Sequence, residues 1–395
     1  MSNLEYSISD LHNLLDLNLR KSMFLNKNSD MYQVALDNKQ NIEQNGNPIY
    51  NKLYKNMKIN VLRDHLNYAG SNKREFSNEE ALQEYDYLID DGQIENKSTG
   101  WRNDYDIRQL SPYNTRTNLS KYQPYLKPTG RLSDFATLYS TGTVGLKYKP
   151  NSKRSTLIGY SDYYNDKDLS CVSVIIDVGK NSTVVLDEHF LNKDGIKIFK
   201  IIYLVRDYAK LVINRKQDIT NKDIGGNIIE SNVIQFPGSS FKYNIEGEGS
   251  KYNQDLMYID VYDDCYTNVV GKFDLYGNYI NNNLIQIHHK AENSKSRVDV
   301  KTIVEDKSYS SFLGSIIVDK NAINTDASLI NKNLLLSNEA TAITEPQLDI
   351  NTKEISCSHG CTVSNIDPNE LYYLESRGIE THMAEETIKQ CFLTT

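Results

Sequence analysis

Alternating apolar and polar positions dominate the middle of this chain. In Met257/Ile259/Val261 and Ile285/Ile287 the apolar side chains fall on every second residue, which is the period of a half-buried strand. Short apolar runs separated by polar segments rich in Asn, Asp, Gly and Lys recur from residue 131 to residue 362: Val172–Val178, Thr183–Leu186, Ile198–Val205, Leu211–Asn214, Met257–Val261, Leu284–Ile287, Val298–Ile303, Phe312–Val318, Leu334–Leu336 and Leu348–Ile350. The pattern predicts a mainly β protein with its core in residues 131–362.

The connections between these runs narrow the choice of architecture. No amphipathic stretch among them is long enough to supply the crossover helices of a doubly wound sheet, which leaves a sandwich, a barrel or a β-helix. Only Pro237 and Pro346 interrupt residues 151–362, so ladder hydrogen bonds can be nearly continuous. A β-helix needs caps at its open ends, and both ends of the chain carry helical patterns. These features favour a parallel β-helix flanked by N-terminal and C-terminal helical regions.

Residues 1–130 are predicted to be a helical and irregular region. An amphipathic stripe is approximated by Leu4, Ile8, Leu11, Leu14, Leu15 and Leu17. The sequence Ser77-Asn78-Glu79-Glu80 has the form of a capping box and predicts a second helix from Ser77 to about Ile89. Residues 93–130, which contain Trp101 and three prolines, are expected to form an irregular connector.

Residues 363–395 are predicted to form a C-terminal helical unit. Asp367-Pro368-Asn369-Glu370 resembles a capping box with proline at the first helical position. Gly378 stands where a glycine would end that helix. A second short helix is expected to follow, with Ala384, Ile388, Cys391 and Phe392 on one face.

Charge and composition exclude several classes of partner. The 395 residues exceed what one hydrophobic core supports, so two or three structural units are expected. The formal net charge is -8 with both signs interspersed, and no basic stripe or basic amphipathic segment points to nucleic acid or to a membrane. No transmembrane run and no secretory signal are recognised. Five cysteines form no disulfide framework, so a reducing, cytoplasm-like compartment is expected, with the plastid stroma and an infected host cytoplasm left open.

The run Cys357-Ser358-His359-Gly360-Cys361 concentrates metal-binding residue types near the end of the chain. It holds two of the five cysteines and one of the seven histidines. In an extended segment Cys357, His359 and Cys361 project to one side. Thiolates beside an imidazole suit zinc, copper or iron–sulfur chemistry. The alternative is a small buried strand, because free cysteine is commonly buried.

The other histidines and cysteines are predicted to be structural. His288 and His289 are adjacent, so on a strand they point to opposite faces, one packed and the other solvated. Cys171 and Cys265 are expected to be buried strand cysteines. Cys391 is expected in the core or against a partner.

Acidic and glycine-rich motifs add no catalytic site. Asp260, Asp263 and Asp264 could mimic the carboxylates of carbohydrate-active β-helices, but a solvated face is the favoured interpretation because no aromatic spacing suits a substrate. The chain has no phosphate-binding loop of the Gly-x4-Gly-Lys-Ser/Thr form, so it is expected to bind no nucleotide.

Five motifs follow one another in the last third of the chain. They are His288–Arg297 (HHKAENSKSR), Asn331–Ser337 (NKNLLLS), Pro346–Ile350 (PQLDI), Cys357–Val363 (CSHGCTV) and Leu371–Ile379 (LYYLESRGI). In this order and spacing, residues 284–392 resemble the C-terminal half of the SufB/SufD family of iron–sulfur cluster assembly proteins. A weaker similarity extends back to about residue 170.

Two details make the resemblance SufD-like. The SufB branch carries a scaffold cysteine where Ser337–Thr344 has none, and a glutamate where this chain has Gly360. The resemblance implies a right-handed parallel β-helix and a non-enzymatic subunit that pairs with a SufB-like subunit. It also implies a SufC-like ABC ATPase bound through the C-terminal helical unit, with Tyr372, Tyr373 and Arg377 as partner-binding residues.

The resemblance gives His359 the principal role. It matches the SufD histidine that faces the SufB cysteine, so it would bind iron or a transient iron–sulfur cluster at the subunit interface. The common SufD pattern has alanine where this chain has Cys361, so Cys361 is an added ligand, a sulfur acceptor or a tolerated small residue. Cys357 is interpreted as a packed strand residue rather than a ligand.

Two other hypotheses stay open. In one, the chain is a homodimeric scaffold in which Cys361 and His359 replace the cysteine missing near Ala340. In the other, it is a carbohydrate-active β-helix enzyme that uses the acidic residues Asp260–Asp264.

Overall fold

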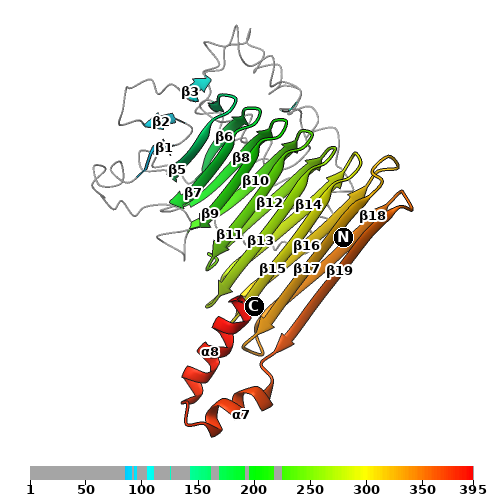
Figure 1. Cartoon of the computed structure of the whole chain (residues 1–395). Coiled ribbons are helices and arrows are strands. Elements are labelled where there is room, and N and C mark those ends of the chain that lie inside the picture. The colour runs from blue at the N-terminus through cyan, green and yellow to red at the C-terminus, as the bar shows by residue number, and fades with distance from the viewer. Residues whose placement is uncertain are drawn as a thin grey trace, which may run out of the picture.

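Two long sheets form the body of the protein (Figure 1). The computed structural model describes residues 85–90, 93–95, 105–110, 125, 143–161, 169–191, 195–217 and 225–394. The ten-stranded sheet has the order β19 (Ile355–Asn365), β17 (Thr325–Leu335), β15 (Lys295–Val304), β13 (Tyr266–Leu275), β11 (Ser240–Gly247), β9 (Lys210–Gln217), β7 (Thr183–Leu191), β5 (Lys153–Ser161), β1 (Tyr87–Asp90) and β2 (Gln93–Glu95). The nine-stranded sheet has the order β18 (Thr341–Ile350), β16 (Tyr309–Val318), β14 (Ile280–His289), β12 (Tyr252–Val261), β10 (Gly225–Gln235), β8 (Gly195–Val205), β6 (Leu169–Val178), β4 (Thr143–Tyr148) and β3 (Tyr105–Leu110).

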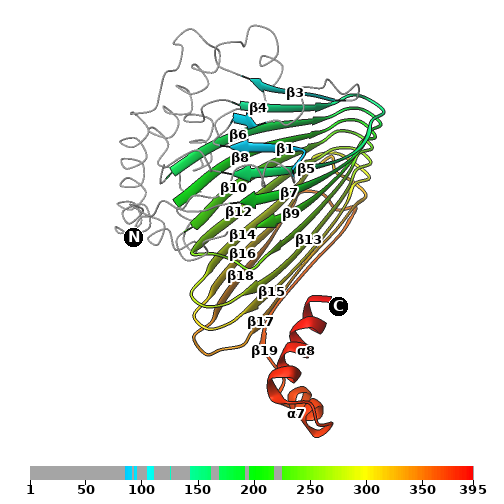
Figure 2. The same ribbon diagram turned by 90° about the vertical axis from the view of Figure 1, so that its left-hand side faces the viewer.

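The chain winds alternately through the two sheets. From β4 onward each strand crosses to the other sheet, and it pairs in parallel with the strand two positions further along. Among the strands that the structure describes, only the pairs β1–β2 and β3–β4 are antiparallel. Each rung of two strands therefore stacks on the rung before it (Figure 2). The predicted parallel β-helix is confirmed.

Seven turns that lead from the nine-stranded to the ten-stranded sheet share one conformation. Each places one residue at positive φ: Asn151, Asn181, Tyr208, Gly238, Asp264, Asn293 and Asn324. Glycine, asparagine and aspartate tolerate this conformation best, which explains why they recur between the apolar runs. The next residue is small and buried in every turn: Ser152, Ser182, Ala209, Ser239, Cys265, Ser294 and Thr325.

The inward faces of the two sheets form one continuous apolar core. In β7 buried and half-buried residues alternate along the whole strand, as expected when one face meets the opposite sheet. Near the end of the stack, Gly314 of β16 lies opposite Leu329 of β17. A Cβ atom at Gly314 would lie only 2.4 Å from Leu329 Cδ1. This contact shows which residues of the two sheets face each other.

Strands occupy two positions where helix or irregular structure was predicted. Tyr87–Asp90 form β1 instead of the end of the helix predicted from Ser77. Pairing with β5 buries Leu88 and Ile89 together, which an exposed helix end could not do. Strand β3 lies within the predicted connector and pairs with β4. The stripe Leu4–Leu17 lies outside the described residues.

The C-terminal two-helix unit is confirmed. Helix α7 (Pro368–Ser376) begins at the N-cap Asp367, whose carboxylate accepts from the backbone N–H of Asn369 at 2.8 Å. Gly378 follows its end with φ of +84°, a conformation that glycine adopts without steric cost. Helix α8 (Thr381–Thr394) lies against β15. No helix in the described ranges is long and apolar enough to cross a membrane.

Candidate functional site

The last rung of the β-helix is open to solvent. Strands β18 and β19 end the two sheets, and among the described strands each pairs on one side only, with β16 and β17 respectively. Seven of the ten residues of β16 are buried, whereas β18 and β19 contain only half-buried and exposed residues. Two backbone edges and the end of the core are therefore accessible to another molecule.

The run Cys357–Cys361 lies in β19, on this open rung. Cys357, His359 and Cys361 continue the inward columns of Ala327, Leu329 and Asn331 on β17. The odd-numbered residues of that strand are buried from Thr325 to Asn333. The prediction that the three side chains share one face is therefore confirmed. His359 is exposed, while both cysteines are half-buried and pack against the core.

The opposite wall of the open rung comes from β18. Pro346 of β18 stacks on Gly314 of β16, and His359 of β19 stacks on Leu329 of β17. Because Gly314 and Leu329 face each other one rung earlier, the register places Pro346 opposite His359. By the same register Leu348 lies opposite Cys357, and Thr344 lies opposite Cys361.

The two cysteines have different surroundings. Burial raises the pKa of the Cys357 thiol above its ordinary value, and this cysteine follows Ala327 in the stack. Cys361 stacks on Asn331 of β17, which is a buried polar residue. Asn333 Nδ2 donates to Asn331 Oδ1 at 2.7 Å and to the carbonyl of Thr362 at 3.2 Å. The sequence reasoning did not assign these asparagines to the site.

The open rung presents soft donors without a closed metal cage. No group of three or more His, Cys, Asp or Glu side chains within the described ranges is arranged to hold a metal ion. Neighbouring inward positions on one strand lie about 7 Å apart. A sulfur or nitrogen donor from another molecule could therefore reach His359 from the open side.

The exposed helix α7 carries the other predicted site residues. Tyr372 and Tyr373 are 71% and 57% exposed, and the Arg377 guanidinium lies 5.3 Å from the centre of the Tyr373 ring. No residue of α7 is buried. These side chains are accessible to a partner, and α7 lies apart from the two sheets although it follows β19 closely in the sequence (Figure 1).

Lys389 ties α8 to the β-helix. Its ammonium pairs with Glu305, just beyond β15, and with Glu386 at 2.8 Å on α8 itself. Burial alone would lower the pKa of Lys389, but the hydrogen bonds to these two carboxylates raise it above its ordinary value. Helix α8 is therefore anchored to the body by a charge-assisted contact.

The adjacent histidines behave as predicted. His289 is fully buried, with Nδ1 2.6 Å from Ser294 Oγ and Nε2 3.0 Å from Ser296 Oγ. His288 is partly exposed, and its Nε2 lies 2.9 Å from Asp319. One is packed and the other solvated, as strand geometry requires.

Acid is expected to destabilise the protein through His289. Burial lowers the pKa of His289 to about 4, against about 6.5 in an unfolded chain. Between these values only the unfolded state binds the proton, so the free energy of unfolding falls by about 3 kcal/mol as the pH drops to 4. Urea denaturation of His289→Gln should show a smaller loss between pH 7 and pH 4, with His288→Gln as the control. Equal losses in His289→Gln and the parent protein would refute this role.

The remaining cysteines and acidic residues are dispersed. Cys171 is buried in β6, as predicted, whereas Cys265 is buried in a turn and not in a strand. Its thiol donates to the carbonyl of Phe236 at 3.2 Å. Cys391 is exposed on α8, so it does not belong to the core. Asp260 pairs with Lys290 at 2.7 Å on the outer surface.

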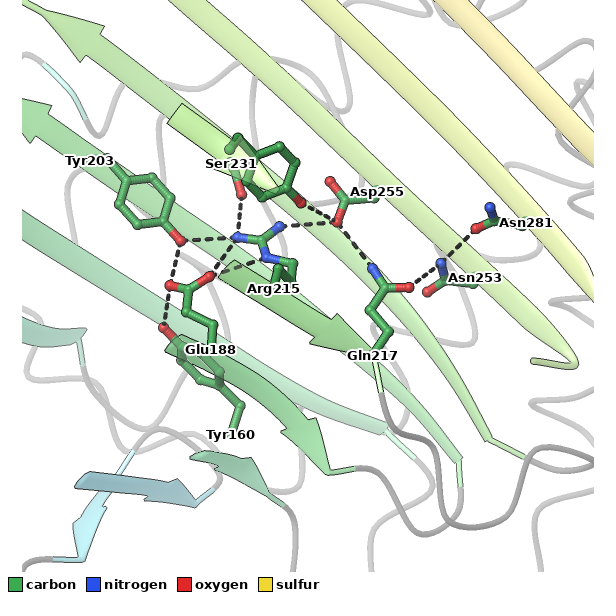
Figure 3. A network of polar contacts seen from close by, with 10 residues as sticks. Tyr160, Glu188, Tyr203, Arg215, Gln217, Ser231, Asn253, Asp255 and Asn281 are labelled. Atoms are coloured by element: carbon green, nitrogen blue, oxygen red, sulfur yellow. Dashed lines mark hydrogen bonds and ion pairs between the residues drawn. The ribbon is translucent and has the colours of Figure 1, made fainter. Parts of the chain in front are cut away.

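A buried charge cluster lies inside the β-helix, and the sequence reasoning missed it (Figure 3). The fully buried Arg215 of β9 pairs with Glu188 of β7 and with Asp255 of β12, each at 3.0 Å. Tyr203 donates to Glu188 at 2.6 Å. Burial, and then the Glu188 carboxylate, raise the pKa of Tyr203 well above its ordinary value. The cluster joins the two sheets in the middle of the stack.

The comparisons with known proteins agree with this arrangement. Residues 163–392 match the family described as SUF system FeS cluster assembly, SufBD core domain. This match covers more than half of the chain. The chain therefore belongs to the SufBD core family.

Within the family the chain is SufD-like. It is 42% identical over 106 residues to the iron–sulfur cluster assembly protein SufD of Escherichia coli, covering 27% of this chain and 25% of that protein. To SufD of Bacillus subtilis it is 30% identical over 149 residues, covering 38% and 33%. To SufD of Plasmodium falciparum it is 22% identical over 255 residues, covering 62% and 17%. The matched stretches thus span a third or less of each relative.

Proposed function

We propose that this chain is a non-enzymatic scaffold subunit that builds nascent iron–sulfur clusters together with a SufB-like subunit and a SufC-like ATPase. The observation that carries the proposal is His359, exposed on the inward face of an open last rung. The cluster is cargo that passes through the site, and this chain binds no nucleotide. Family membership supports the assignment to cluster assembly.

The open edges favour pairing with another β-structure. Strand β18 has ten residues and β19 has eleven, and the described strands leave one edge of each unpaired. Exposed edges of this length bind further strands through main-chain hydrogen bonds. A partner that continues either sheet would bring its own side chains against the inward face of β19. His359 would then be enclosed between the two chains.

The chemistry of His359 suits a shared site. A neutral imidazole binds iron through a ring nitrogen, whereas a protonated imidazole does not. A thiolate from the SufB-like partner would supply the soft donor that iron–sulfur chemistry needs. Placing one ligand on each chain makes cluster formation depend on assembly.

The helical unit is suited to the ATPase. It carries an excess of acidic residues: Asp367, Glu370, Glu375, Glu380, Glu385 and Glu386 against Arg377 and Lys389. Exposed tyrosine and arginine side chains are enriched at protein interfaces. The anchor of α8 on the β-helix leaves α7 free to present Tyr372 and Tyr373 to a partner.

Co-expression tests the proposal directly. A tagged chain produced with SufB-like and SufC-like proteins should copurify with both, and the purified chain alone should show no hydrolysis of ATP. Absence of any complex would refute the heteromeric role. If the chain instead formed a stable dimer with itself and ignored the SufB-like protein, the homodimeric scaffold would replace it.

The double variant Tyr372→Ser/Tyr373→Ser is expected to weaken binding of the ATPase at least tenfold, because exposed aromatic anchors dominate interface energies. Binding of the SufB-like subunit should be unchanged, since α7 lies apart from β18 and β19. The affinities can be measured by calorimetry with each partner. Tyr266→Ser, at another exposed tyrosine, is the matched control. Equal ATPase affinity for the double variant and the control would exclude α7 as the contact.

A further inference from the structure

Two buried polar atoms near Cys361 have no hydrogen-bond partner. They are Asn333 Oδ1 and Thr344 Oγ1. Asn333 is only 1% exposed, and its Nδ2 donates to Asn331 Oδ1 and to the carbonyl of Thr362. Both of these partners are acceptors, so the amide orientation is fixed and the unpaired atom is the oxygen.

Such atoms are costly in a folded protein. A buried donor or acceptor left without a partner costs about 1–3 kcal/mol. Most buried polar groups are paired, so each exception calls for an explanation such as a bound water, an ion or a role in the site's chemistry. The two unpaired atoms come from different sheets, Asn333 from β17 and Thr344 from β18. Both belong to the inward face at the Cys361 end of the open rung.

The other cysteine of the run has no such surroundings. Cys357 follows Ala327 in the stack, and the register places it opposite Leu348. Leu348, Cys357 and Cys361 all pack against the hydrophobic core, but the two unpaired polar atoms lie at the Cys361 end. Cys357 and Cys361 are equally distant from His359 along the strand, so their chemical surroundings alone distinguish them.

We propose that Cys361 is the second cluster ligand that this chain supplies, beside His359, with Thr344 and Asn333 as its polar support. Cys357 is then a structural residue. The Thr344 hydroxyl would donate to a sulfur of the bound cluster, and Asn333 Oδ1 would accept a hydrogen bond from a donor that arrives with the cluster. Hydrogen bonds to sulfur tune iron–sulfur sites. Two neighbouring inward positions on one strand let both ligands reach the same cluster. This inference rests on the proposed scaffold function.

Matched cysteine variants test the inference. The assembled complex is reconstituted anaerobically with ferrous iron and sulfide, and iron and sulfide per complex are measured together with the charge-transfer absorbance. Ferrous iron binding before sulfide is added gives a second readout. Cys361→Ala is expected to retain at least tenfold less cluster than the parent complex, and Cys357→Ala to retain more than half. Thr344→Val, which preserves side-chain shape, should shift the absorbance and weaken iron retention.

The outcomes separate the inference from the function on which it rests. If Cys361→Ala matches the parent while His359→Ala loses the cluster, the inference is overturned and the scaffold function stands. If Cys357→Ala and Cys361→Ala lose cluster equally, the assignment of distinct roles is overturned. If none of the three variants changes cluster retention, the proposed function itself fails. Thermal unfolding of each variant, with Cys361→Ser as a size-conserving second substitution, shows whether a loss reflects misfolding.

Discussion

Replacing Arg215 by methionine is expected to lower the free energy of unfolding by about 3–5 kcal/mol, a large fraction of the roughly 5–15 kcal/mol by which folded proteins are stable. The substitution removes the cation that pairs with both Glu188 and Asp255, and both carboxylates remain buried. An uncompensated buried charge cannot be rescued by packing alone. Urea denaturation followed by circular dichroism measures the change.

Two further variants test whether unpaired buried charges cause this loss of stability. Arg297→Met breaks an ion pair with Asp326 in which both side chains are partly exposed, 41% and 35%, and it should cost about 1 kcal/mol or less. The triple variant Arg215→Met/Glu188→Gln/Asp255→Asn removes both carboxylates together with the cation and should recover much of the loss. If Arg215→Met costs no more than Arg297→Met, the buried charges do not stabilise the stack as argued.

His359→Ala is expected to reduce cluster formation by the assembled complex at least tenfold, because it removes the exposed nitrogen ligand from the open rung; even residues that only orient metal ligands affect affinity by about 10–100-fold. The melting temperature and the copurification of both partners should be unchanged, since the side chain is exposed. Iron retained after gel filtration under anaerobic conditions is the measurement.

His382→Ala is the matched control, because His382 is a solvent-exposed histidine on α8. His359→Cys supplies a different soft donor at the same position and should restore part of the retained iron. Retention by His359→Ala at the level of the control would remove this residue from the site.

The strands could be predicted from the sequence because apolar and polar residues alternate along a strand that has one buried face. The same alternation places Arg215 and Glu188 at inward positions, after Leu211 and Ile213 in β9 and after Val184 and Leu186 in β7. A charged residue at an inward position signals a buried cluster, but its partners come from other rungs. Which rungs meet depends on turn lengths, which a strand's own residues do not encode.

For the site, too, the sequence predicted the local arrangement but not the neighbours that come from other strands. Period two placed Cys357, His359 and Cys361 on one face without knowledge of the fold. Nothing within β19 indicates that it ends a sheet, because exposure depends on whether another strand follows in the stack. Asn333 and Thr344 precede Cys357, the first residue of the run, by 24 and 13 residues, and only stacking brings them to its side. A helix reaching Ile89 was predicted from a local capping pattern, but this segment forms a strand because it pairs with β5.

The open rung affects how the chain behaves before it is assembled. Two unpaired edges can template the pairing of any available strand, including those of other nascent copies. Binding to a dedicated subunit stabilises the folded form by mass action, whereas an excess of unassembled copies would be exposed to aggregation and proteolysis. Under the proposed pairing, production of this chain and a SufB-like subunit in matched amounts would therefore limit aggregation before assembly, in addition to completing the site.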